Sequence, residues 1–307
     1  VFKILDKLVK KGGILASNTS YLDINELALV TSRPQDVIGL HFFSPANIMR
    51  LLEIVIPDKV SNDVVATGFQ LAKMLKKIPV RSGVCDGFIG NRILDKYGDC
   101  ALHMIEDGAT PYEIDKAIYE FGYPMGPFQM FDLAGGDIGW AKRKRQAKFR
   151  DPKSRYVNIP DRLCEKGWFG QKTGRGYYRY DQGNRKGDKD HEVLELIDLE
   201  RQEKGIIPKK YSQDEIIRRY MAAMINEAAD VVYEKIALRP SDVDVVKLFG
   251  YGFPKYRGGP LKYADAHGLD KILNHLRKFE NEDPIFWKPS ELIIQLVNRG
   301  DNFESLN

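Results

Sequence analysis

The first 80 residues alternate between two patterns of apolar positions. Apolar residues at helical spacing predict helices at about residues 2–10, 22–30 and 62–75. Short runs rich in β-branched residues lie between them and predict strands at residues 14–17, 37–43, 51–56 and 78–80. Strands that alternate with helices imply a largely parallel α/β sheet. The strands at 37–43 and 51–56 are joined by a short turn, so we expect them to form an antiparallel pair at one edge of that sheet.

From Gly87 onward the pattern becomes helical, and its order of elements occurs twice. A helix at 91–104, a second helix that starts at Thr110-Pro111 and a Gly-Tyr-Pro break at Gly122 come first. About 130 residues later, a long helix at 215–232, a second helix and a Gly-Phe-Pro break at Gly252 follow. Gly122 aligns with Gly252 at an offset of 130, and the aspartates of the two second helices, Asp115 and Asp244, align at 129. The simplest explanation is an internal duplication of a helical unit. Convergent helix-capping chemistry explains the helix starts but hardly the matched break.

Composition narrows the functional class. The chain is 43% hydrophobic and 29% charged, with a net charge of +4, which is ordinary for a globular protein and implies neither membrane insertion nor a nucleic-acid partner. Three cysteines without metal-ligand spacing fit reduced thiols in an intracellular compartment. The basic run at residues 142–145 reads either as a solvated helix face or as a site for an anionic ligand tail. The polar residues 181–190 predict a mobile surface loop.

His41 and Glu53 are the candidate catalytic pair. They lie in the two strands joined by the short turn, so the end of one strand is close to the next. A histidine titrates near neutral pH, and a neighbouring carboxylate fixes its tautomer and stabilises the imidazolium. Asn18, Ser20 and His41 fall at strand ends, where ligands gather in α/β sheets. The alternative to a catalytic pair is that His41 is a core residue with its hydrogen bonds made and that Glu53 lies in solvent.

Five ordered motifs together resemble the 3-hydroxyacyl-CoA dehydrogenase family. They are Ser17-Asn-Thr-Ser20, Gly39-Leu-His-Phe-Phe-Ser-Pro45 with Glu53, Asp86-Gly-Phe-Ile-Gly-Asn-Arg92, Gly122-Tyr-Pro-Met-Gly-Pro127 and Lys172-Thr-Gly-Arg-Gly-Tyr177. The second helical unit, with its Gly252-Phe-Pro segment, looks like the dehydrogenase half of the multifunctional enoyl-CoA hydratase/3-hydroxyacyl-CoA dehydrogenases.

The resemblance implies NAD-dependent oxidation of (S)-3-hydroxyacyl-CoA to 3-ketoacyl-CoA in fatty acid β-oxidation, in a peroxisome or a cytoplasm. His41 matches the family's base, Glu53 its partner, and Ser20 and Asn91 the residues that hold the substrate. The cofactor contacts implied are Asn18, Ser20, Ser44 and Lys172, although single-unit members usually carry Asn at the position of Ser44.

The same resemblance implies a domain plan. Residues 1–82 match the C-terminal part of an NAD-binding Rossmann domain, residues 83–205 a first helical unit, and residues 206–307 a second. The fold class is thus a partial Rossmann-type α/β sheet followed by an all-α domain of two duplicated units. Single-unit members dimerise through the helical domain, so we expect a monomer in which the two units pair within one chain.

One departure from the family concerns the cofactor. The chain contains no Gly-x-Gly-x-x-Gly motif, which the family carries ahead of the part matched here. We therefore expect an N-terminally truncated chain that binds NAD poorly by itself. Two other functions stay open: a catalytically silent acyl-CoA-binding or structural relative, and an NAD-dependent dehydrogenase of small hydroxy acids, which more often uses a lysine for proton transfer.

Overall fold

The computed structural model describes residues 1–181 and 184–307. The chain forms two compact units. The first comprises Val1–Lys96, Met224–Leu276 and Pro289–Asn307, and the second comprises Tyr97–Ala223 and Arg277–Lys288. Helices α4 (Gly90–Asp107) and α10 (Gln213–Tyr233) each belong partly to both units. The domain boundaries after residues 82 and 205 stay a prediction.

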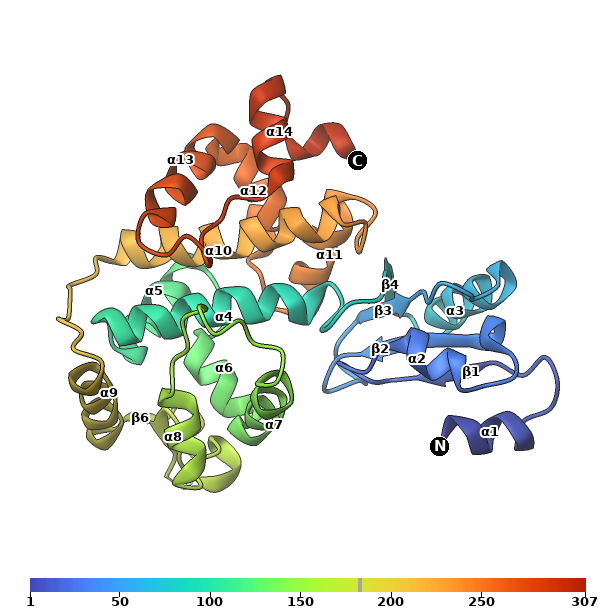
Figure 1. The fold of residues 1–307 in the computed structure, drawn as a ribbon, viewed down its shortest axis with the longest axis horizontal. Helices are drawn as coiled ribbons and strands as arrows, with labels where there is room; N and C mark the ends of the chain where they lie inside the picture. Colours follow the sequence, from blue (N-terminus) through green and yellow to red (C-terminus); the bar gives the residue numbers. More distant parts are fainter. Residues whose placement is uncertain (182–183) are drawn as a thin grey trace. The chain divides into compact units, whose positions relative to one another are not determined.

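The first unit contains a four-stranded sheet made of β1 (Leu15–Ser17), β2 (Val37–Phe42), β3 (Leu51–Val55) and β4 (Ile78–Ser82) in that order (Figure 1). β1 pairs with β2 and β3 with β4 in parallel, whereas β2 and β3 are antiparallel. The predicted antiparallel pair is therefore present, but its expected place at an edge is wrong. Both strands lie inside the sheet because β4 adds to the outer side of β3.

Both faces of the sheet are covered, as alternating side chains of one strand show. Val37 packs into a core with α1 (Phe2–Leu8) and α2 (Ile24–Leu29). Its neighbour Ile38 packs into a second core with α3 (Asn62–Met74) on the other face. Successive side chains of a strand point to opposite faces, so a sheet covered on both sides needs apolar residues at consecutive positions. That requirement explains the continuous apolar runs in the sequence.

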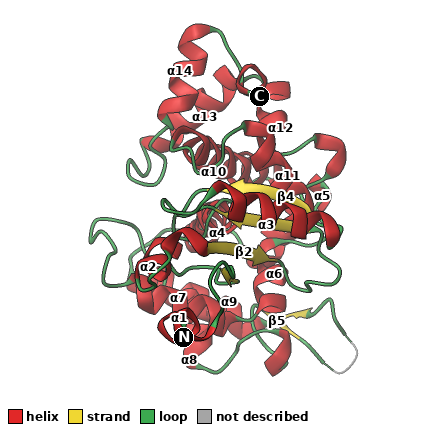
Figure 2. Ribbon diagram, turned by 90° about the vertical axis from the view of Figure 1, so that its right-hand side faces the viewer, coloured by secondary structure: helices red, strands yellow, loops and turns green. Residues whose placement is uncertain are grey.

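Most of the remaining chain is helical (Figure 2). The further helices are α5 (Pro111–Phe121), α6 (Pro127–Ala134), α7 (Gly136–Gln146), α8 (Ile159–Glu165), α9 (His191–Glu203), α11 (Pro240–Gly250), α12 (Pro260–His267), α13 (Leu269–Glu280) and α14 (Glu291–Arg299). No helix among the described residues is both long and apolar enough to cross a membrane.

A small hairpin corrects the surface loop expected at residues 181–190. β5 (Tyr178–Arg179) pairs with β6 (Asp188–Lys189) in an antiparallel ladder. The loop prediction is wrong for β6, because a strand of two polar residues leaves no apolar period to detect. Gln182 and Gly183, which the same prediction included, lie outside the described residues.

The two helical copies share an unusual helix start. In the first, the buried Asp115 of α5 accepts hydrogen bonds from the amides of Phe128 and Gln129 at the start of α6, both at 2.9 Å. In the second, the buried Asp244 of α11 accepts from the amides of Leu261 and Lys262 at the start of α12, at 2.8 and 3.1 Å. Each aspartate satisfies amides that a helix start leaves without partners. The duplication expected from the sequence thus extends to the bonds that join consecutive helices.

A second pair of aspartates repeats in the same way. Asp132 in α6 accepts from the amides of Tyr177 and Tyr178, and Asp265 in α12 accepts from the amides of Phe303 and Glu304, all at 2.9 Å. Burial raises the pKa of Asp132 to about 6 against the bonds that it accepts. Both copies therefore use one carboxylate, buried at Asp132 and half-buried at Asp265, to fasten the chain that returns to the unit.

Asp244→Ala is expected to lower the free energy of unfolding by about 1–3 kcal/mol, because two amides at the start of α12 lose their acceptor. Asp115→Ala is expected to cost more, since Asp115 also accepts from the Tyr178 hydroxyl at 2.9 Å. Denaturant unfolding of the two variants beside the exposed control Asp301→Ala measures both effects. If Asp244→Ala and Asp301→Ala unfold alike, the capping role is contradicted.

Candidate active site

His41 and Glu53 lie directly opposite each other in the antiparallel pair of β2 and β3. Residues in such cross-strand positions project their side chains on the same face of the sheet, a few ångströms apart. The imidazole Nδ1 of His41 lies 2.6 Å from Oε2 of Glu53, and the two side chains are 5% and 0% exposed. The strand register alone therefore places these two groups in contact.

The second oxygen of Glu53 also has a donor. The backbone N–H of Gly90, at the start of α4, donates to Oε1 at 2.9 Å. An ionised carboxylate can only accept hydrogen bonds. Beside the carboxylate form of Glu53, Nδ1 of His41 carries the ring proton, and Nε2 presents its lone pair. An imidazole held in this tautomer can accept a proton at Nε2 while the carboxylate stabilises the resulting charge.

Ser20, which is half-buried, lies on the other side of the His41 ring from Glu53. Its Oγ is 3.0 Å from His41 Nε2. Its loop, which follows β1, is fastened to β2 because the Asn18 side-chain oxygen accepts from the amide of Phe42 at 2.9 Å. The structure thus brings together three of the predicted site residues, Ser20, His41 and Glu53, in a chain of two hydrogen bonds.

Aromatic rings hold the imidazole of His41. The ring of Phe43 lies 4.7 Å from it between centroids and that of Phe88 lies 5.5 Å away, edge-on. Phe88 is 1% exposed and has a φ of 53°, in the left-handed region that a non-glycine residue rarely adopts. Such strain persists where surrounding contacts require it and is frequent at functional sites.

The other predicted residues are less directly placed. Asn91, the second residue of α4, accepts at Oδ1 from the hydroxyl of Tyr251 at 2.8 Å. Ser44 is exposed just after β2. Lys172 belongs to the second unit, where it is exposed and forms an ion pair with Asp137. The hydrogen bond from Lys172 lowers the pKa of Asp137.

The chain matches the family model of the 3-hydroxyacyl-CoA dehydrogenases over most of its length. Residues 1–85 match the NAD binding domain, and residues 87–180 and 216–304 each match the C-terminal domain. The chain belongs to the 3-hydroxyacyl-CoA dehydrogenase family. The predicted resemblance and fold class are thereby confirmed, and the C-terminal domain occurs twice, as the repeat indicated.

Proteins longer than this chain are among its matches. It is 44% identical over 314 residues to a peroxisomal bifunctional enzyme of Danio rerio, covering 98% of the chain and 44% of that protein. The chain therefore spans less than half the length of this curated relative. The dehydrogenase part of multifunctional enzyme 1 from C. elegans matches with 30% identity and a TM-score of 0.68, over 96% of this chain and 67% of that one. A 3-hydroxybutyryl-CoA dehydrogenase from Escherichia coli, at 23% identity and a TM-score of 0.80 over 97% and 78% of the two chains, shows the fold.

The residues after β1 carry polar groups at the end of the sheet where a dinucleotide is expected to bind. Dinucleotides bind beyond the carboxyl ends of parallel strands, and Asn18 and Ser20 follow β1 at that end. The side-chain oxygen of Asn18 is committed to the amide of Phe42, so its amide nitrogen is the group that can donate to a ligand. NAD is the cofactor of this domain family. The polar groups of Asn18 and Ser20 can form hydrogen bonds with a carboxamide or a ribose.

Two contributors to the His41–Glu53 site escaped sequence reasoning. The Gly90 amide donates to Glu53, and the Phe88 ring packs on His41. Both lie in the segment Asp86–Arg92, which was singled out only for Asn91. Backbone donors carry no residue-type signal, so the one available clue was the glycine. A Cβ at Gly90 would lie 2.4 Å from the Tyr251 ring, so a larger residue does not fit there.

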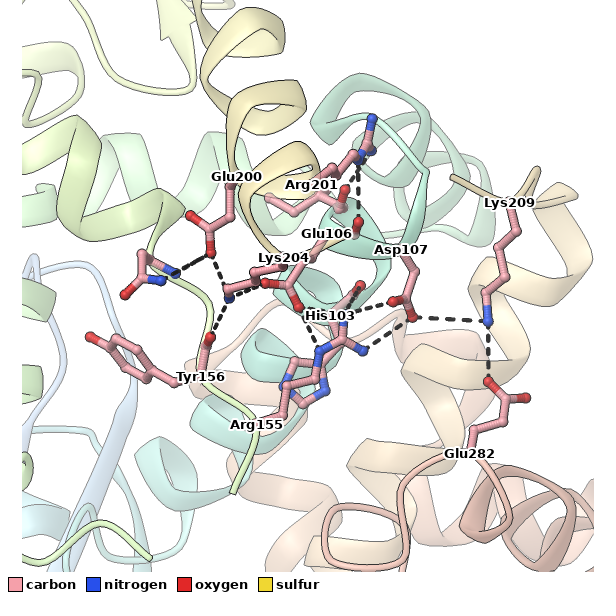
Figure 3. Close-up of polar contacts among 12 residues, drawn as sticks. His103, Glu106, Asp107, Arg155, Tyr156, Glu200, Arg201, Lys204, Lys209 and Glu282 are labelled. Atoms are coloured by element: carbon pink, nitrogen blue, oxygen red, sulfur yellow. Dashed lines mark hydrogen bonds and ion pairs between the residues drawn. The ribbon is translucent and has the colours of Figure 1, made fainter. Parts of the chain in front are cut away.

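A second cluster of charges, in the second unit, serves its structure (Figure 3). Glu106 of α4 accepts hydrogen bonds from Arg155 and Lys204. Lys204 also forms an ion pair with Glu200 at 2.8 Å, and Arg155 forms one with Asp107 at 2.6 Å. Each charge thus faces an opposite one. Compensated networks of this kind fix the packing of helices and satisfy buried ions.

Proposed function

We propose that the protein containing this chain oxidises (S)-3-hydroxyacyl-CoA to 3-ketoacyl-CoA with NAD in fatty acid β-oxidation. The observation that carries the proposal is the buried His41–Glu53 pair, with Nε2 of His41 aimed at Ser20. Membership of the 3-hydroxyacyl-CoA dehydrogenase family supplies the substrate class. The reaction removes a proton from the 3-hydroxyl oxygen and a hydride from C3. The His41–Glu53 pair is suited to removing the proton.

His41 is the proposed base. Its Nε2 takes the proton of the substrate's 3-hydroxyl, and Glu53 stabilises the imidazolium through Nδ1. Ser20 lies within hydrogen-bond distance of the same nitrogen and is proposed to hold the 3-oxygen. Asn91 is proposed to donate to a second substrate oxygen. Donors fixed in advance stabilise charge that develops on oxygen during the reaction.

Cofactor contacts are proposed for Asn18, Ser20, Ser44 and Lys172. When bound, NAD supplies the acceptor for the hydride that leaves C3. Asn18 and Ser20 follow β1, Ser44 follows β2 and Lys172 comes from the second unit. These side chains would bind and orient the nicotinamide end through hydrogen bonds and, at Lys172, through charge.

Two other functions fit the arrangement of Ser20, His41 and Glu53 less well. In a catalytically silent acyl-CoA-binding protein, a buried histidine, a buried carboxylate and a serine would have no chemical reason to form a relay. In a dehydrogenase of small hydroxy acids, a lysine would be the expected proton-transfer group, and here the group is His41. The intact relay therefore favours the oxidation of a hydroxyacyl thioester.

The test is NADH-dependent reduction of acetoacetyl-CoA by the complete natural protein, beside free acetoacetate at the same concentrations. We expect turnover of the thioester, followed as loss of NADH absorbance, and little turnover of the free acid. Preference for the free acid would support a small-molecule dehydrogenase. Binding of acetoacetyl-CoA without turnover of either compound would support the silent relative.

The compartment and assembly are part of the proposal. We propose a peroxisomal enzyme, supported by relatives named peroxisomal bifunctional enzymes. The second helical unit supports a monomer, because it can cover within one chain the surface through which single-unit members dimerise. The cytoplasm is the alternative compartment, and no nucleic-acid partner is proposed.

A further inference from the structure

At the end of their second helix, the two helical copies differ in length by one residue. Helices α5 and α11 have 11 residues each and begin with Pro111 and Pro240. In the first copy, Gly122 of the Gly-Tyr-Pro break follows α5 directly. In the second copy, Tyr251 stands between α11 and the Gly-Phe-Pro break. This extra residue explains why the repeat offset changes from 129 to 130.

Tyr251 contacts three residues that lie close to the His41–Glu53 pair. Its hydroxyl donates to Oδ1 of Asn91 at 2.8 Å. Its ring occupies the space in front of Gly90, the residue whose amide binds Glu53. It also lies 5.5 Å from the ring of Phe43, edge-on at 76°, and Phe43 packs on His41. The added residue therefore contacts Asn91 itself, a neighbour of Glu53 and a neighbour of His41.

Two residues near the end of α11, Lys247 and Gly250, also favour this placement of Tyr251. Lys247 stands where the first copy has the buried Ile118, yet its side chain is fully buried and its Nζ lies 3.7 Å from the centre of the Tyr251 ring. Burial lowers the pKa of Lys247 well below its usual range, and the charge of Glu53 opposes that shift. A Cβ at Gly250 would lie 2.5 Å from the side chain of Leu51 in β3. The glycine thus lets the end of α11 approach the strand that carries Glu53.

We propose that Tyr251 is a positioning residue that fixes the side-chain amide of Asn91 for substrate binding. An asparagine amide has one oxygen that accepts and one nitrogen that donates. Because the hydroxyl of Tyr251 occupies the oxygen, the nitrogen is left to donate to an acyl-CoA oxygen. A free amide would sample both orientations and present the wrong atom part of the time. The second helical copy thereby becomes part of the active site, and this inference rests on the proposed function.

The experiment compares Tyr251→Phe, Asn91→Ala and the double variant in the complete protein, with acetoacetyl-CoA and NADH. Tyr251→Phe keeps the ring and removes only the hydroxyl. We expect kcat/KM to fall about 3- to 10-fold, the usual effect of one hydrogen bond. In the Asn91→Ala background the same change should cause no further fall, because Tyr251 acts through Asn91. Tyr256→Phe, an exposed tyrosine five residues later, is the matched control and should keep wild-type kcat/KM.

Each outcome decides the matter. A wild-type kcat/KM in Tyr251→Phe overturns the inference and leaves the proposed function standing. Additive losses in the double variant overturn it as well, since they assign Tyr251 a general structural effect. A wild-type protein that turns over no acetoacetyl-CoA removes the proposed function, and this inference with it. A loss that disappears in the Asn91→Ala background supports the positioning role.

Discussion

His41→Gln is expected to lower kcat for acetoacetyl-CoA reduction by about 100- to 10,000-fold, the usual contribution of a positioned acid–base group. In the reductive direction the imidazolium returns its proton to the 3-oxygen, and glutamine has no proton of suitable acidity to give. Glutamine approximates the size of the imidazole and can still donate to Glu53 through its amide. The measurement is steady-state turnover of the complete protein with acetoacetyl-CoA and NADH.

The control for His41→Gln is His191→Gln, which changes a histidine 85% exposed in its side chain at the start of α9. It should keep wild-type turnover. Circular dichroism and the unfolding midpoint of the His41 variant establish that it is folded. Turnover of folded His41→Gln within threefold of the wild type would remove His41 from the role of base.

Glu53→Gln is the second change with a large expected effect, about 100- to 10,000-fold in kcat by analogy with the aspartate-to-asparagine exchange in serine protease triads. The Gly90 amide already donates to one oxygen of Glu53. A glutamine that keeps this bond turns its amide nitrogen toward Nδ1 of His41, where two donors would meet. The imidazole relieves the conflict by moving its proton to Nε2, the atom that must accept the substrate proton in the oxidation.

Replacing Glu53 by glutamine separates the effect of the charge from that of the geometry. Glu53→Gln changes few atoms, so the fold and the substrate KM should change little while kcat falls. Glu26→Gln, an exposed residue of α2, is the control. If Glu53→Gln raises KM and leaves kcat unchanged, the carboxylate acts in binding and the tautomer argument is wrong.

The pairing of His41 with Glu53 could be predicted because both lie in strands joined by a short connection. A short loop restricts such strands to neighbouring, antiparallel positions. The order of the strands in the sheet could not be predicted. β4 is connected to β3 through a helix, and its apolar pattern would be the same beside β3 or at another edge of the sheet. The expected edge position was wrong for that reason.

The helical repeat shows the same limit at another level. Asp115 and Asp244 could be matched from their spacing, and the family model matches both copies. Their bonds to the next helix could not be predicted, because these join residues 13 and 17 positions apart through space. The roles of Ser20, Asn91, Asn18, Ser44 and Lys172 stay predictions.

The opposition of His41 and Glu53 across two hydrogen-bonded strands also bears on how the site can vary in evolution. Insertions or deletions in the segment between β2 and β3 are absorbed outside the ladder and leave the two side chains face to face. One residue inserted within either strand, however, turns every side chain beyond it to the opposite face of the sheet. An insertion in β3 ahead of Glu53 would then place the carboxylate in the apolar layer under α3, and no partly working arrangement lies between. Among related sequences, insertions and deletions should therefore occur in the turn at residues 43–50 and not inside the two strands.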